Sequence, residues 1–162
     1  ASAGYSVQPE TARTMIEQGA ANSQTAANLR MDPVEWQLKV LQEDYRIFEA
    51  LDPDAITITD TSFIEDLVFA DRAGIEVGPN AQEWLRRKRY RLVFFLEPLE
   101  RYEQSESRME SRSLAEVIGK AVYERYIEYG YAPVVIPAAS VSERVALVTA
   151  AMSKAGVSSP LD

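Results

Sequence analysis

Short, uniformly apolar segments alternate along this chain with longer segments in which apolar residues recur at helical spacing. The short segments are rich in β-branched and aromatic residues, which favour strands, and the longer ones are typical of helices. We predict strands at residues 5–8, 55–60, 91–96 and 132–137. We predict helices at residues 10–18, 32–51, 62–73, 79–89, 111–129 and 140–155. Strands that are apolar throughout are typical of parallel sheets covered on both faces, so the pattern predicts a three-layer α/β/α fold with a mostly parallel sheet.

Local signals define several of the helix ends. Asp32-Pro33 places a capping residue before a proline at the first helical position. Gly130 is expected to end the long helix that precedes it. Residues 20–30 are small and polar, and they predict a loop or a weak helix end. Because no internal repeat and no linker interrupts the pattern, we interpret residues 1–162 as a single domain.

The composition narrows the chemistry that such a domain can perform. The chain contains no cysteine and no histidine. These absences exclude disulfides, thiolate metal sites, cysteine nucleophiles, the Ser-His-Asp triad and nearly every kind of zinc site. Any reaction must therefore use carboxylates, Arg, Lys, Tyr, Ser or Thr, backbone amides or a bound Mg²⁺.

The charge and hydropathy of the chain bear on its partners. A net charge of -8 argues against a general nucleic-acid-binding surface. The longest apolar run, residues 92–96, is far too short to span a bilayer, and the first nine residues lack the pattern of a signal peptide. We therefore expect a cytoplasmic protein without nucleic-acid or membrane partners, in which an anionic ligand binds only at a local basic site.

Several short motifs follow one another in an order that spans most of the chain. They are Glu10-Thr11-Ala12-Arg13, the strand-ending Asp60, Val93-Phe94-Phe95-Leu96-Glu97-Pro98, Arg108 with Glu110, Tyr126, Gly130-Tyr131, Val135-Ile136-Pro137 and Glu143-Arg144. In this order and spacing the chain resembles the small predicted AAA-type ATPases, whose fold is similar to that of nucleoside and nucleotide kinases. The resemblance implies a P-loop NTPase fold that uses ATP and Mg²⁺.

Two features depart from the pattern of that family. No segment matches the phosphate-binding motif G-x-x-x-x-G-K-[ST], and Thr61 stands where relatives usually carry Arg. Residues 1–5 look instead like the tail of the family's first helix. We therefore expect an N-terminally incomplete domain that lacks the first strand, the Walker A phosphate loop and most of the first helix. The alternative is a degenerate relative that closes the gap with another strand, for example one swapped between the subunits of a homodimer.

Asp60 is the strongest candidate for a catalytic and Mg²⁺-binding residue. An acid at the carboxyl end of a central parallel strand lies where ligands bind in open α/β sheets. In phosphoryl transfer such an acid can hold Mg²⁺ through water or accept the proton of an acceptor hydroxyl. The structural alternative is a helix cap, because Asp60, Thr61 and Ser62 all precede a predicted helix and all three residue types cap well.

The resemblance assigns further roles to two arginines before the long helix. Arg108 and Arg112 are expected to close over phosphates and to neutralise charge in the transition state, with Arg108 also contacting the nucleotide. The alternative is a solvated turn in which these arginines form salt bridges with Glu106 or Glu110.

Three more residues receive binding roles from the resemblance. Glu10 and Arg13 are expected to contact the acceptor substrate, although their i, i+3 spacing also suits an internal ion pair. Arg144 is expected to contact the adenine side of the nucleotide, and the alternative is a surface arginine beside a dipole-favoured Glu143. The basic run at residues 86–91 is interpreted as a solvated helix end in preference to an anion-binding surface.

The sequence thus leads to two functional hypotheses. In the first, the complete protein is an ATPase or a small-molecule kinase of the nucleoside or nucleotide type, and the unidentified acceptor binds near residues 18–32. In the second, it is a catalytically inactive interaction or regulatory domain, as the absent phosphate loop and Thr61 suggest. Under either hypothesis we expect the 162-residue chain alone to bind ATP weakly, because no glycine-rich turn followed by lysine occurs in it.

Overall fold

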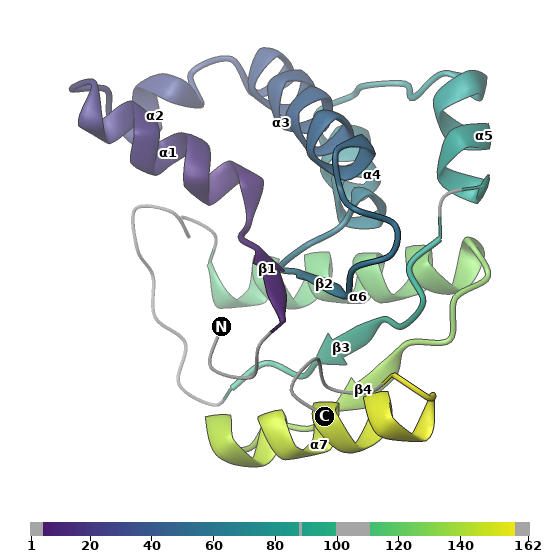
Figure 1. Cartoon of the computed structure of the whole chain (residues 1–162). Helices are drawn as coiled ribbons and strands as arrows, with labels where there is room; N and C mark the ends of the chain where they lie inside the picture. Colours follow the sequence, from purple (N-terminus) through teal and green to yellow (C-terminus); the bar gives the residue numbers. More distant parts are fainter. Residues whose placement is uncertain (1–4, 88, 100–110, 158–162) are drawn as a thin grey trace.

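The computed structural model describes residues 5–87, 89–99 and 111–157. In these ranges helices and strands alternate along the chain, as the pattern predicts (Figure 1). The elements in order are β1 (Ser6–Gln8), α1 (Thr11–Ala21), α2 (Ala26–Leu29), α3 (Pro33–Glu49), β2 (Thr57–Thr59), α4 (Phe63–Arg72), α5 (Pro79–Arg87), β3 (Phe94–Leu96), α6 (Arg112–Glu128), β4 (Val134–Ile136) and α7 (Val141–Lys154). The predicted strands and helices are confirmed, but each strand is only three residues long, and α2 stands in a region expected to be a loop or a weak helix end.

The strands pair in parallel, as predicted, but they form two sheets rather than one. β1 pairs with β2, with Val7 opposite Ile58, and β3 pairs with β4, with Phe95 opposite Val135. Among the described residues no strand hydrogen bond joins β2 to β3. The continuous sheet between two helical layers is therefore not formed by these residues.

The strand side chains are also less covered than their composition predicts. Val7, Ile58 and Leu96 are 48%, 38% and 49% exposed, although a parallel sheet normally buries such residues on both faces. The prediction of strands buried throughout is wrong at these positions, because the described helices do not cover that side of the strands.

The core lies where α4 packs between α3 and α6. Ile64 and Leu67 of α4 are 1% and 2% exposed, and each such side chain contributes about 1.5–3 kcal/mol by its burial. An aromatic cluster of Phe48, Phe63 and Trp84 closes one end of this core through edge-to-face contacts at 4.7–5.7 Å. This packing fixes α4, and with it the turn that connects β2 to α4.

Helix ends follow local sequence signals. The Asp32 carboxylate accepts hydrogen bonds from the amides of Val34 and Glu35, each at 3.0 Å, so the predicted start of α3 is confirmed. Gly130 adopts a φ of +75° after α6, and the next amide bonds back to the Tyr126 carbonyl at 2.9 Å, as expected of a helix terminator. No described helix has both the length and the apolar character needed to cross a membrane.

Candidate functional site

The turn between β2 and α4 carries Asp60, Thr61 and Ser62. The Asp60 amide donates to the Gln8 carbonyl at 2.9 Å, which extends the ladder between β1 and β2 by one bond. Ser62 caps α4, since its hydroxyl accepts from the Ile64 amide at 3.1 Å. The helix cap weighed for Asp60 is thus provided by Ser62, and the Asp60 side chain is not used for that purpose.

Thr61 holds a strained conformation in this turn. Its φ is +96°, in a region that β-branched residues avoid at a cost of about 1–3 kcal/mol. The surrounding structure imposes it, because Asp60 must complete the ladder while Ser62 caps α4. Backbone strain of this kind is concentrated at functional sites.

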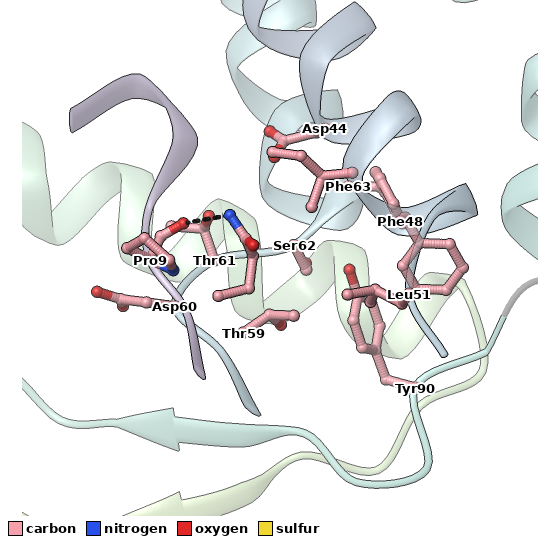
Figure 2. Close-up of a pocket in the computed structure, with 12 residues that line it drawn as sticks. Pro9, Asp44, Phe48, Leu51, Thr59, Asp60, Thr61, Ser62, Phe63 and Tyr90 are labelled. Atoms are coloured by element: carbon pink, nitrogen blue, oxygen red, sulfur yellow. Dashed lines mark hydrogen bonds between the residues drawn. The ribbon is translucent and has the colours of Figure 1, made fainter. Parts of the chain in front are cut away.

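A small cavity lies beside this turn, at the carboxyl ends of β1 and β2 (Figure 2). Its volume is about 20 Å³, which suffices for a single water molecule. Phe48, Leu51 and Tyr90 form its apolar side, and Asp60 points away from them. The cavity is too small for a nucleotide, so any larger ligand at Asp60 must lie outside it.

Asp60 is exposed, and its carboxylate forms no hydrogen bond or ion pair with another described residue. The described residues contain no group of three acidic side chains arranged to hold a metal ion. A nucleotide-bound Mg²⁺ requires less, since it keeps several waters and uses one or two carboxylates together with the phosphates. The exposed Asp60 carboxylate meets this smaller requirement.

Sequence reasoning missed a chain of hydrogen bonds behind this turn. The Ser62 and Tyr126 hydroxyls lie 2.6 Å apart, and Tyr126 donates to Glu65 Oε1 at 3.1 Å. Burial raises the pKa of Glu65 to about 7, although the hydrogen bond from Tyr126 acts to lower this pKa. The nearby negative charges of Asp60 and Glu10 also raise the pKa of Glu65. Glu65 therefore changes protonation near neutral pH within the electrostatic range of Asp60.

A second buried acid links the helices around the site. Asp66 of α4 is 6% exposed, and burial raises its pKa to about 9, aided by the charge of Asp44 on α3 and a hydrogen bond with it. Asp44 also accepts a short hydrogen bond from the Thr11 hydroxyl of α1. The two acids thus interact across α3 and α4, with α1 attached to Asp44 through Thr11. The sequence signal for Asp66 is its helical spacing with the buried Phe63, Leu67 and Ala70, which places a carboxyl on the core face.

The two residues predicted to contact an acceptor substrate lie at the start of α1. Glu10 is the residue that precedes the helix, and its carbonyl accepts from the Thr14 amide at 3.0 Å. Arg13 forms its ion pair with Glu17 at 3.0 Å, with both side chains more than half exposed. The ion pair of Arg13 therefore lies within α1, with Glu17 one turn later in place of Glu10. The charges of Glu10 and Asp60 both act on Glu65, and Arg13 lines neither described cavity.

The predicted arginines are distributed among different parts of the molecule. Arg108 falls outside the described residues. Arg112 is the first residue of α6 and pairs with Glu116 at 3.1 Å. Arg144 donates to the carbonyls of Pro137, at 3.2 Å, and of Glu97, so it ties together the segments that follow β4 and β3. These hydrogen bonds give Arg144 a structural role at the carboxyl ends of both strands.

Two arginines of the basic run at residues 86–91 bind the carboxyl ends of α6 and α7. Arg89 donates to the carbonyls of Tyr129 and Gly130 at 2.6 and 2.9 Å, at the end of α6. Arg91 donates to the carbonyls of Ala155 and Gly156, both at 3.2 Å, at the end of α7. The sequence favoured a solvated end of the run's own helix, whereas Arg89 and Arg91 lie beyond α5 and bind the ends of α6 and α7.

A family model described as an AAA domain matches residues 1–144. The matched range includes all six residues given candidate roles from the sequence, from Glu10 to Arg144. No curated protein and no solved structure matches the chain significantly.

Proposed function

The chain belongs to the AAA domain family, a membership that indicates a nucleotide-binding domain of the P-loop NTPase type, and we propose that the protein binds Mg²⁺–ATP and hydrolyses or transfers the γ-phosphate. The observation that carries the proposal is Asp60. Its carboxylate is exposed at the carboxyl end of a parallel strand, it does not cap the following helix, and a strained residue follows it.

In this proposal Asp60 acts on the reacting groups directly. Mg²⁺, when bound, supplies charge neutralisation on the phosphate oxygens. The Asp60 carboxylate either holds a water of that ion or accepts the proton of the attacking hydroxyl or water. The hydrogen-bonded path from Ser62 through Tyr126 to Glu65 keeps the backbone of this turn in place, because it ties the turn to α6.

No segment of residues 1–162 matches the phosphate-binding motif, so the proposal includes an additional element. We propose that a further parallel strand, followed by a phosphate loop and a helix, pairs with the open edges of β2 and β3. No strand of the described part of the chain pairs with those edges, and the side chains of Val7, Ile58 and Leu96 are left exposed. A strand and helix at that position would satisfy the edges and cover the apolar side chains together.

Residues 1–162 contain no glycine-rich turn followed by lysine, so this chain alone should bind Mg²⁺–ATP only in the millimolar range, about −4 kcal/mol. The test is calorimetric titration of Mg²⁺–ATP into this chain and into the longest polypeptide that its gene encodes. The proposal expects micromolar binding in the longer protein and loss of its Mg²⁺ dependence in the Asp60→Asn variant. If the longer polypeptide binds Mg²⁺–ATP no more tightly than the 162-residue chain does, the result favours the inactive interaction domain instead.

The choice between ATPase and kinase rests on an acceptor. If the longer protein hydrolyses ATP but phosphorylates nothing in a broad screen of nucleosides and metabolites, the kinase form of the proposal is abandoned. A product that carries the γ-phosphate of labelled ATP would establish it, and the groove described next indicates which class of acceptor to test first.

A further inference from the structure

A second and larger hollow lies between α1 and α3. Its volume is about 480 Å³, within the range of pockets that hold small molecules. Its walls come from the end of β1 and from facing sides of the two helices, namely Gln8, Thr11, Thr14, Met15, Gln18, Lys39, Gln42, Glu43, Arg46 and Ile47. We call this hollow the α1–α3 groove.

The two helix faces that meet across the groove are polar. On α1 the lining residues Thr11, Thr14, Met15 and Gln18 follow i, i+3, i+4, i+7 spacing, and on α3 Lys39, Gln42, Glu43 and Arg46 do the same. Helices that pack together in a soluble domain normally face each other with apolar side chains. Here every one of those positions except Met15 carries an amide, a hydroxyl or a charge, which favours a polar ligand beyond the point where Thr11 bonds to Asp44.

The groove is continuous with the candidate site. Gln8 and Ile47 line both the groove and the small cavity beside Asp60. A ligand that fills the groove therefore places one end near the carboxyl end of β1, next to the strand that Asp60 terminates. An acceptor hydroxyl at that end would be within the region where the proposed phosphoryl transfer takes place.

The charges along the groove are arranged in order on α3. Lys39 and Arg46 are two turns apart, about 10 Å along the helix axis. Arg46 binds both oxygens of Glu43, at 2.9 and 2.5 Å, and this contact lowers the pKa of Glu43, so that the pair presents a fixed carboxylate acceptor. Within the described ranges Lys39 pairs with the exposed Glu35, which does not line the groove, and an exposed pair of this kind yields easily to another anion.

The lining residues also indicate what the ligand is not. None of the described residues that line the groove is aromatic, so there is no surface on which a nucleobase would stack. The amides of Gln18 and Gln42 and the Glu43 carboxylate instead offer hydrogen bonds to hydroxyl groups, and Lys39 offers a contact for an anionic group. The hydroxyls of Thr11 and Thr14 already donate to Asp44 and to the Glu10 carbonyl.

We propose that the α1–α3 groove binds a small, non-aromatic, anionic polyol, such as a sugar phosphate, and that this molecule is the phosphoryl acceptor. The acceptor role rests on the proposed function, whereas binding in the groove does not. The ligand's anionic group contacts Lys39, and its hydroxyls contact the Glu43–Arg46 pair and the amides of Gln18 and Gln42.

Binding can be measured in the 162-residue chain without ATP. The chain has four methionines, of which Met15 lines the groove and Met152 is buried in α7. With ¹³C-methyl methionine, and with Met15 assigned through Met15→Leu, titration with ribose 5-phosphate or glycerol 3-phosphate should shift the Met15 signal and leave Met152 in place. Adenosine at the same concentration should shift neither signal.

Lys39 provides the second readout. Lys39→Gln should weaken binding of ribose 5-phosphate about threefold to fivefold, the range expected for an exposed ionic contact. Lys120→Gln is the matched control, because Lys120 also forms an exposed i, i+4 pair, with Glu124, and lies on α6 away from the groove. The Lys120→Gln variant should bind ribose 5-phosphate with the same affinity as the unmodified chain.

Three results would overturn the inference. They are an unmoved Met15 signal with both phosphates at millimolar concentration, equal binding of adenosine, and equal loss of affinity in Lys39→Gln and Lys120→Gln. A Met15 response in a protein that never binds ATP would leave the groove as a binding site and reject the proposed function alone. ATP binding without a Met15 response would reject the groove as a binding site and leave the proposed function in place.

Discussion

Replacing Asp66 by asparagine should make the protein more stable at neutral pH. Asp66 is 6% exposed, and its pKa is raised to about 9 by burial and by Asp44. At pH 7 the folded protein keeps this proton, whereas the unfolded chain, with an ordinary aspartate pKa near 3.9, has lost it. Asparagine imitates the protonated acid in shape and can donate to Asp44 as the acid does.

The sign of the effect follows from counting protons. Between about pH 4 and pH 9 the unfolded state binds fewer protons than the folded state, so the free energy of unfolding falls as pH rises. A single group contributes at most about 1.4 kcal/mol per pH unit, hence at most about 4 kcal/mol from pH 5 to pH 8. Asp66→Asn removes this term. The variant should match the wild type within about 1 kcal/mol at pH 5 and exceed it increasingly up to pH 8.

The assay is urea unfolding at each pH, followed by tryptophan fluorescence. Trp84 reports unfolding because it belongs to the aromatic cluster at one end of the core. Asp54→Asn is the control, because Asp54 is an exposed aspartate in a turn, and it should leave the pH dependence of the wild type in place. The reasoning is refuted if Asp66→Asn retains the full slope of the wild type, because Asp66 would then be ionised in the folded state.

Three further substitutions test local features. Thr61→Gly should stabilise the fold by about 1 kcal/mol in urea titrations, because it relieves a φ of +96°, whereas Thr57→Gly in β2 should destabilise it. Arg89→Gln should lower thermal stability by about 1–3 kcal/mol, since two carbonyls of α6 lose a charged donor, and the exposed Arg87→Gln should change little. Ser140→Ala should cost about 0.5–2 kcal/mol in chemical denaturation through loss of the capping box of α7, and an unchanged midpoint would contradict that role.

Helix positions could be predicted from the sequence because their signals are local. Asp32-Pro33 and Gly130 act on backbone groups within four residues of themselves, so their effect does not depend on the rest of the fold. Strand identity and parallel pairing were also predictable, but strand length and the division into two sheets were not. Pairing depends on partners distant in sequence, and each strand continues only as far as its partner does.

The candidate site was predictable in part for the same reason. Asp60 could be located because it ends an apolar run, and its place after β2 is confirmed. The interaction of Asp44 with Asp66 joins two helices, and the carbonyls bound by Arg89 lie 40 and 41 residues further along the chain. Contacts of that range leave only a weak trace in the sequence, such as an acid on the core face of α4. The sequence suggested an acceptor near residues 18–32, whereas the groove is lined mainly by α1 and α3.

A strand that completed the sheet at the edge of β2 would also affect the candidate site at Asp60. A strand that pairs with β2 on its free edge must run beside Thr57–Thr59, and a parallel strand would end at the same level as Asp60. The turn after such a strand would then present its backbone amides next to the Asp60 carboxylate, which is the arrangement that a Mg²⁺–triphosphate needs. An element that completed the sheet without those amides would restore stability and leave Asp60 without a ligand. Stability and Mg²⁺–ATP affinity, measured together on the longest encoded polypeptide, therefore distinguish an active nucleotide-binding domain from an interaction domain.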